Sequence, residues 1–391
     1  MKLFLSLITI LVCSGCAEGL YDNAGDTTGQ NVTAKSSGSE SDEEHALSCS
    51  RVLDEHDPNG VHNMGSEPHF EGWYYRVTDP NTEDSWVIIV AYWLNDSGET
   101  SAFIELIHAE TGAVYKEVIE GVDLAAIQDQ AGTFDINFGG MRFSSEHIAG
   151  SFTTEDGAEV TVNIAIDGCA RWGAPDDDFN RWTMGWVTEM PGVPLRWHVN
   201  HLKAFATGTI ETPDGQWIID DFPIHQEKNW GEAFPKKWMW FQANQFEGRD
   251  DVAFAAAVGP VITHRFAPTG YMAGLRINDE FFTWRTQDTH SLERAWFWVN
   301  ERTNEARWSL VGESHRYRVD VEVWAPLEEL IPIDIPTNDG LQPGAVEHLA
   351  ARMEIRLYEK NLIGWSLMEE ITTTAAAVEA GGTYAFDNDL L

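Results

Sequence analysis

The run Val160-Thr161-Val162-Asn163-Ile164-Ala165-Ile166 alternates branched apolar side chains with smaller or polar ones. Successive side chains of an extended chain point to opposite faces, so this run gathers its valines and isoleucines on one face. The same alternation recurs in Tyr317, Val319, Val321 and Val323, and again in Met353, Ile355 and Leu357. The pattern predicts β-strands, and we expect strands to dominate the chain.

Turn-forming residues lie between the apolar runs at the spacing of antiparallel hairpins. They are Asp79-Pro80-Asn81, Asn95-Asp96-Ser97-Gly98, Pro213-Asp214-Gly215 and Asn338-Asp339-Gly340. No long stretch has a sustained helical period, although residues 118–130 are suited to a short helix. The sequence therefore predicts an all-β fold of sandwiches or barrels, and a closed barrel has an interior that can hold an apolar ligand.

Two aromatic segments resemble each other and predict a tandem arrangement. Glu71-Gly72-Trp73-Tyr74-Tyr75 and Lys237-Trp238-Met239-Trp240-Phe241-Gln242 both read as first strands entered from a turn. We expect two antiparallel β-barrels in tandem, or a barrel and a sandwich, with an N-terminal domain at 49–228 and a C-terminal domain at 229–391.

The composition limits the partners of the protein. Sixty-three acidic and twenty-five basic side chains give a formal charge of −38. Such a charge repels polyanions, which argues against nucleic acid and anionic lipid headgroups as partners. Seventeen Trp, nineteen Phe and nine Tyr must find places in a core, an interface or an aromatic pocket. Nothing in the composition points to an oligomeric state.

The first residues have the pattern of an export signal. Lys2 precedes an apolar run, Leu3 to Val12, which is too short to span a bilayer, and then Cys13-Ser14-Gly15-Cys16. Small residues before a cysteine resemble a lipobox, so we expect a signal peptide at 1–15 and lipidation of Cys16. Residues 16–48 are acidic and rich in Ser and Gly, which predicts a flexible stalk.

These features predict an exported lipoprotein of the cell envelope, held at a membrane by its N-terminal lipid anchor. Ala17 after the lipidated cysteine favours the outer membrane. Cleavage before Cys16 would leave Cys49 and Cys169, in a compartment where disulfides persist. A Cys49–Cys169 bridge and two free buried thiols are both compatible with this spacing.

Several blocks resemble the tocopherol cyclase-like family. They are Pro68–Arg76, Arg142-Phe143-Ser144, Gln226–Asn244 and Asp339-Gly340, followed by the strand Met353–Tyr358. Their order and separation also fit, over roughly residues 60–385. The resemblance, shared with hydroxyneurosporene synthase-like and other lipocalin-like twin-barrel proteins, implies a tandem calycin-like fold. It also implies acid-initiated chemistry on a prenyl double bond.

Protonating an alkene requires an acid in an apolar pocket, where burial raises the pKa of a carboxyl group. Glu71 and Glu227 are the carboxylates that we predict to be catalytic, because both have aromatic neighbours. Glu71 could instead pair with an arginine such as Arg76. His225 is a possible proton relay, although a structural role is the more common one for such a histidine. Asp220 and Asp221 are weaker candidates in a turn.

Aromatic and amide side chains near these acids form the predicted substrate site, in which indole faces would stabilise a cation. The predicted substrate-binding residues are Trp73, Tyr75, Asn229, Trp230, Trp238, Trp240, Gln242 and Asn244. Trp238, Trp240, Gln242 and Asn244 should share one strand face, with the amides able to orient a phenol or quinone oxygen. Packing in a β core is the alternative for each ring.

We expect neither a metal nor a cofactor. His198 and His201 are three apart, so on a strand they point to opposite faces, and no acidic or cysteine partner is recognisable. Nucleophile-elbow, zinc-protease and phosphate-loop motifs are absent from the sequence.

Two functions remain open at this stage. The first is a cofactor-independent cyclase or hydratase acting on an isoprenoid phenol, quinol or carotenoid-like lipid. The second is a lipocalin-like carrier of an apolar small molecule or lipid. A structural protein of the envelope is a third, less specific alternative.

Overall fold

The computed structural model describes residues 60–62, 65–128, 134–173, 182–260, 269–337, 339–388 and 390. The predicted signal peptide, Cys16, the stalk and Cys49 lie outside these residues, as does the side chain of Cys169. The lipid anchor and the disulfide therefore stay predictions. The described residues all belong to one compact unit. Within the described part of the chain, no helix has both the length and the apolar composition needed to cross a membrane.

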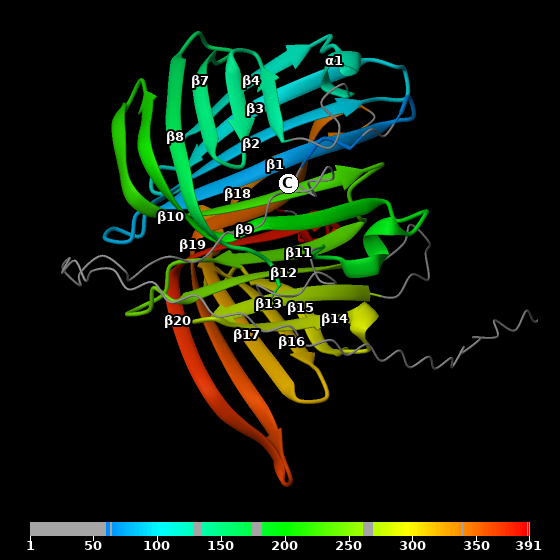
Figure 1. The fold of residues 1–391 in the computed structure, drawn as a ribbon, viewed down its shortest axis with the longest axis vertical. Coiled ribbons are helices and arrows are strands. Elements are labelled where there is room, and N and C mark those ends of the chain that lie inside the picture. The colour runs from blue at the N-terminus through cyan, green and yellow to red at the C-terminus, as the bar shows by residue number, and fades with distance from the viewer. Residues whose placement is uncertain are drawn as a thin grey trace, which may run out of the picture. The chain divides into compact units, whose positions relative to one another are not determined.

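The first sheet has ten antiparallel strands in the order β4-β3-β2-β1-β10-β9-β8-β7-β6-β5 (Figure 1). Its strands are β1 (His69–Thr78), β2 (Ser85–Leu94), β3 (Thr100–His108), β4 (Val114–Glu120), β5 (Asp135–Phe138), β6 (Met141–Ser144), β7 (His147–Thr153), β8 (Glu159–Ala170), β9 (Leu195–Thr212) and β10 (Gly215–Gly231). Two short helical segments, α1 (Leu124–Gln128) and η1 (Gly185–Glu189), belong to the same half of the chain. The helix predicted within 118–130 is thus confirmed.

The second sheet has the order β14-β13-β12-β11-β20-β19-β17-β16-β15, and β18 pairs with β19. Its strands are β11 (Lys237–Ala243), β12 (Val252–Pro260), β13 (Thr269–Ile277), β14 (Glu280–Arg285), β15 (Ser291–Asn300), β16 (Glu305–Glu313), β17 (Tyr317–Pro326), β18 (Ile331–Thr337), β19 (Gly340–Asn361) and β20 (Gly364–Gly382). The short helical turns η2 (Thr286–Asp288), η3 (Leu327–Glu329) and α2 (Thr383–Phe386) connect or follow these strands.

The two sheets repeat one topology. In each, the first strand pairs with the last, β1 with β10 and β11 with β20, and successive hairpins extend the sheet on either side. The predicted aromatic first strands are β1 and β11. The all-β, lipocalin-like fold class predicted from the sequence is confirmed, and the chain forms two large antiparallel sheets. The chain passes from one sheet to the other between Gly231 and Lys237, and the domain division at 228 stays a prediction.

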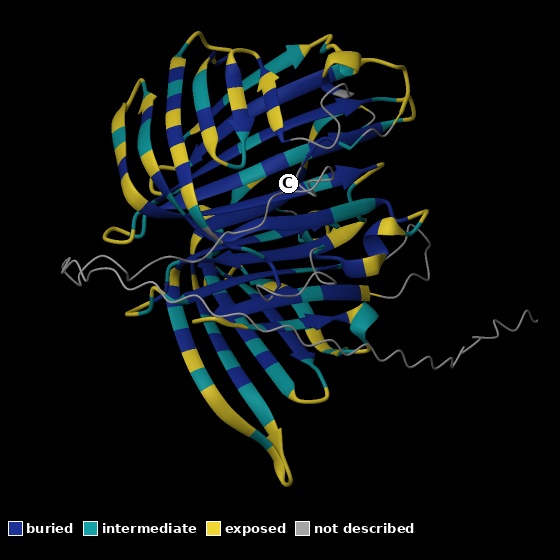
Figure 2. Ribbon diagram, in the orientation of Figure 1, coloured by how far each residue is buried: buried dark blue, intermediate teal, exposed yellow. Residues whose placement is uncertain are grey.

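In the described part of the chain, alternation along the strands produces a core for each sheet, a core shared by both, and a small fourth cluster around Phe70 and Trp93. Along β11, Met239 and Phe241 belong to the core of the second sheet, whereas Trp238 and Trp240 belong to a core shared by both sheets. Trp73 belongs to the core of the first sheet. Figure 2 shows the resulting bands of buried residues along the strands, with exposed residues gathered at the hairpin ends.

Polar side chains also join the two sheets across this shared core. The buried Arg76 guanidinium donates to Gln242 Oε1 at 3.0 Å and to the backbone oxygens of Leu349 and Ala375. Lys116 Nζ contacts Glu105 on its own sheet at 2.6 Å and Asp334 on the other at 2.8 Å. These contacts fix how the facing strands of the two sheets are placed.

Candidate functional site

A cavity of about 400 Å³ lies between the two sheets. Strands β1, β2, β9 and β10 contribute one side, and β11, β12, β13, β18 and β20 contribute the other, with η1 beside them. Most of the lining is apolar or aromatic, and it includes Tyr74, Ile89, Met184, Trp186, Met190, Trp197, Phe234, Trp238, Trp240, Met272 and Ile333. A cavity of this composition fits an apolar ligand, and its few polar groups would fix the ligand's orientation.

Glu227 on β10 is one of the carboxylates in the cavity wall, and the residue is only 3% exposed. Its Oε2 accepts a hydrogen bond from Trp240 Nε1 at 3.0 Å and lies 3.0 Å from His225 Nε2. His225 Nδ1 lies 3.3 Å from the backbone oxygen of Leu202, which can only accept, so Nδ1 carries a proton.

Glu379 on β20 is a second carboxylate in the wall of the cavity. Glu379 is partly exposed. Trp238 Nε1 donates a hydrogen bond to its Oε1. Burial raises the pKa of Glu379 to about 7; the bond from Trp238 opposes this rise, and the nearby Glu227 adds to it. At neutral pH a large fraction of Glu379 therefore carries a proton.

Glu347 lies behind Glu379, and the two are direct cross-strand partners on β19 and β20. Tyr74 OH, from the first sheet, donates to Glu347 Oε1 at 2.9 Å. Burial and the charge of Glu379 raise the pKa of Glu347 to about 8, while Tyr74 and the Arg76 guanidinium oppose the rise. Like charges placed directly opposite on neighbouring strands destabilise a sheet, so the pair is favoured when it retains a proton.

Glu71, predicted to be catalytic, lies elsewhere. Its carboxylate is fully buried against the Lys228 ammonium at 2.5 Å, and it accepts bonds from Tyr92 OH and the backbone N–H of His62. Burial alone would raise its pKa, but Lys228 and His62 lower it to about 2. Glu71 is therefore anionic near neutrality and is a poor proton donor. The sequence also allowed Glu71 to form an ion pair with an arginine such as Arg76. Glu71 does form an ion pair, but its partner is Lys228.

The cavity brings together part of the predicted substrate site. Trp73, Asn229, Trp238 and Trp240 line it with Glu227. Tyr75 belongs to the core of the first sheet and donates to the backbone oxygen of Ser144.

The remaining three residues of the predicted site lie outside the lining. Trp230 stacks on His62, with ring centroids 4.1 Å apart. Gln242 accepts from Arg76, and Asn244 is fully buried near the end of β11. The functional roles assigned to all of these residues stay predictions.

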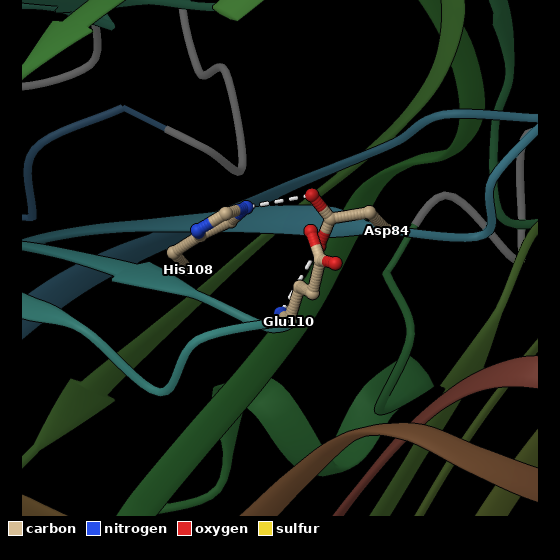
Figure 3. A group of neighbouring side chains, drawn as sticks. All are labelled: Asp84, His108 and Glu110. Atoms are coloured by element: carbon tan, nitrogen blue, oxygen red, sulfur yellow. Dashed lines mark hydrogen bonds and ion pairs between the residues drawn. The ribbon is translucent and has the colours of Figure 1, made fainter. Parts of the chain in front are cut away.

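Three residues have side chains close enough together to hold a metal ion, and Figure 3 shows them: Asp84, His108 and Glu110. His108 Nε2 lies 2.6 Å from Asp84 Oδ2, and the Glu110 backbone N–H donates to Asp84 Oδ1 at 3.1 Å. The Trp86 ring stacks on the His108 ring at 4.3 Å. These contacts explain the group as a structural link between the β1–β2 and β3–β4 turns. The absence of a metal remains a prediction.

The acids of the second sheet were missed from the sequence. Glu347 follows Ala345-Val346, and Glu379 follows Ala375-Ala376-Ala377-Val378. In both places a lone acid interrupts small apolar residues that would be buried on both faces of a strand. That interruption could have identified the two acids, because a carboxylate is almost never buried in such a strand unless it has a partner or a function.

Comparison with known proteins adds the family. The tocopherol cyclase-like family model matches residues 113–382. A probable chloroplastic tocopherol cyclase from Oryza sativa subsp. japonica is 23% identical over 378 residues, covering 83% of this chain and 78% of the rice protein. A chloroplastic tocopherol cyclase from Zea mays is 25% identical over 206 residues, covering 51% of this chain and 42% of the maize protein.

Solved structures also align with the chain. The kievitone hydratase of Nectria haematococca aligns with a TM-score of 0.46 at 14% identity, over 83% of this chain and 91% of the hydratase. A putative AttH from Nitrosomonas europaea aligns with a TM-score of 0.44 at 11% identity, over 86% and 99% of the two chains. Likenesses at this level say nothing about function. The family match spans more than half of the sequence and confirms the resemblance read from its motifs: the chain belongs to the tocopherol cyclase-like family.

Proposed function

We propose that the protein is a cofactor-independent acid catalyst that cyclises or hydrates a prenyl double bond of an apolar lipid held between the two sheets. One observation carries this proposal: Glu379 lies in the wall of an apolar, tryptophan-lined cavity, where burial raises its pKa to about 7. A carboxylic acid in such a place can donate its proton without any metal or cofactor of its own. Membership of the tocopherol cyclase-like family supports the same class of reaction.

The first step transfers the Glu379 proton to one alkene carbon. The π electrons form the new C–H bond, Glu379 becomes a carboxylate, and the other carbon becomes a tertiary cation. Trp238 and Trp240 line the cavity, and a desolvated indole face stabilises a cation by about 2 kcal/mol. The new carboxylate adds a second electrostatic stabilisation, because it is held close to the cation that it created.

The second step closes the ring or adds water. A phenol oxygen, or water, donates an electron pair to the cation and then loses its proton. That proton returns to the Glu379 carboxylate formed in the first step, and the Glu227–His225 pair, in contact through Oε2 and Nε2, is near enough to Glu379 to relay it. Asn229 lines the cavity two residues along the same strand, with an amide that can bind the oxygen before it reacts. Cyclisation is thus a net isomerisation, and the site regains its protons.

The experiment is incubation of the purified protein with a prenylated quinol in D₂O, followed by mass spectrometry. We expect an isomer or a hydrate that carries one non-exchangeable deuterium on carbon. Glu379→Gln should abolish product, and Glu227→Gln should reduce it at least about a hundredfold, as expected for loss of a general acid or base. Glu99→Gln, an exposed site in the β2–β3 turn, is the matched control and should retain full activity.

A lipid that binds tightly and is returned unchanged by the wild-type protein would overturn the catalytic proposal. The chain would then be a carrier of apolar lipids, the second function that its sequence allows. A product that forms equally in Glu379→Gln would reject Glu379 as the donor while leaving the reaction class intact.

A further inference from the structure

The hairpin of β19 and β20 ends in two exposed aliphatic side chains. Leu362 is fully exposed, and Ile363 is 97% exposed. Leu367 and Met368, farther along β20, are 51% and 42% exposed. The hairpin reaches away from the rest of its sheet in Figure 1, and its tip is exposed in Figure 2. No fold requirement explains apolar residues there, since two-residue turns favour Asn, Asp and Gly.

The internal repeat supplies a matched comparison within the same chain. The equivalent hairpin of the first sheet, β9–β10, also turns in two residues, with Thr212 paired to Gly215. In the second sheet, Asn361 pairs with Gly364. Both closing glycines have a positive φ, 144° in Gly215 and 141° in Gly364. The first turn reads Pro213-Asp214 and the second Leu362-Ile363, so this hairpin geometry does not require apolar residues.

The tip is built so that it can enter an apolar medium. Backbone pairing between β19 and β20 continues to Asn361 and Gly364, which leaves few unsatisfied backbone groups at the end. Lys360 Nζ lies 5.4 Å from the centre of the Trp365 ring, one pair of residues below the tip. An aromatic ring beside a long cationic side chain is typical of the boundary between lipid headgroups and hydrocarbon.

We propose that the β19–β20 tip docks on a lipid bilayer, with Leu362 and Ile363 inserted below the headgroups. A protein partner fits poorly, because a stable protein interface buries about 800 Å² on each side, far more than a two-residue turn presents. The charge favours a zwitterionic surface. Glu359 and Lys360 balance each other beside the tip, whereas the chain as a whole carries −38 and is repelled by anionic lipid.

Docking through this tip does not depend on the chemistry proposed for the cavity. Glu379 lies on β20 near the opposite end of the strand from Gly364. Failure of one proposal therefore leaves the other standing. Glu379→Gln should bind vesicles like the wild type, and tip variants should retain activity on a detergent-dispersed substrate.

The test is flotation of the full chain with phosphatidylcholine vesicles, using Cys16→Ser throughout so that no lipid can be attached there. In the turn-swap variant, Leu362→Pro with Ile363→Asp, the tip takes the sequence of the first-sheet turn. We expect its partitioning to fall about tenfold for each side chain removed. Leu362→Ser with Ile363→Ser, which adds no charge, should lose binding similarly. Ile218→Ser changes a 65% exposed residue on the other sheet and should bind vesicles like the wild type.

A second measurement locates the contact. Brominated phosphatidylcholine should quench part of the tryptophan fluorescence, and Trp365→Phe should remove that part. Equal vesicle binding by the swap, the double-serine and the wild-type chains would overturn the proposal. It would also be overturned by a dimer in solution that the swap dissociates, because the tip would then contact a second copy of the chain.

Discussion

Glu347 and Glu379 lie directly opposite each other on β19 and β20, and both have a raised pKa, about 8 and about 7. Their ordinary value is 4.5. Between pH 4.5 and 8 the folded protein therefore binds more protons at this pair than the unfolded chain does. The linkage between proton binding and folding then requires that stability falls as the pH rises through this window.

The corresponding prediction concerns denaturation as a function of pH. Where the folded protein holds one more proton than the unfolded chain, the wild-type free energy of unfolding should fall by about 1.4 kcal/mol for each unit of pH increase. This fall should end once the pH exceeds 8. Glu347→Gln with Glu379→Gln should flatten this dependence. Buried histidines with lowered pKa values make stability rise with pH below pH 6.5, which opposes this effect. Their contribution is the same in both proteins, so it cancels when the two free energies of unfolding are subtracted. Parallel curves for the two proteins would contradict the assignment.

The Glu71–Lys228 pair should matter for stability. Glu71→Gln leaves the Lys228 ammonium buried between the Trp73 and Trp230 rings without its carboxylate. Breaking one side of a buried pair costs about 3–5 kcal/mol. Urea denaturation should show this loss, and Glu71→Met with Lys228→Met should recover part of it because no charge is left unpaired. A Glu71→Gln protein of wild-type stability would show that the pair is not structural.

Much of the fold could be predicted from the sequence because it depends on local patterns. Alternation at Val160–Ile166 and turn residues such as Pro213–Gly215 report on one strand or one hairpin at a time. Trp238, Trp240 and Glu227 were identified as site residues because rings and acids cluster within a short stretch. All three line the cavity.

The rest depends on pairing between distant strands. Glu379 reaches the cavity because β20 returns to pair with β11, more than a hundred residues earlier in the chain. Lys228 meets Glu71 only through the register of β1 and β10, in which Trp73 lies opposite Lys228. Short-range patterns do not determine such registers, and a shift of one residue would reverse the faces. Glu379, the acid that we propose, therefore could not be picked out from the sequence.

The indole N–H of Trp238 should set the pH range of catalysis. Its hydrogen bond to Glu379 favours the carboxylate and lowers the pKa of that group. Trp238→Phe removes the donor, so the pKa of Glu379 should rise and the alkaline limb of the pH–rate profile should move upward. Trp240→Phe is the matched control, since Trp240 donates to Glu227. An unchanged alkaline limb in Trp238→Phe would mean that Glu379 does not govern the profile.

Gly381 lies against the Trp238 ring, which lines the cavity, and should not tolerate a larger side chain. A Cβ placed there would overlap the Trp238 ring, whose position sets both the cavity wall and the hydrogen bond to Glu379. Gly381→Ala should therefore displace Trp238 and cost about 1–3 kcal/mol of stability, as overpacking does. It should also weaken binding of an apolar fluorescent probe about tenfold.

Gly259→Ala is the control for this substitution. Gly259 lines the cavity, but the nearest atom to an added Cβ is the backbone oxygen of Lys237 at 3.4 Å, an ordinary contact. Probe titration and thermal unfolding of the two variants should separate them clearly. If the two variants lost probe binding and stability equally, any added methyl group near the cavity would be enough to cause the loss. A specific loss in Gly381→Ala would show that the Trp238 ring must stay in place for an apolar ligand to bind beside Glu379.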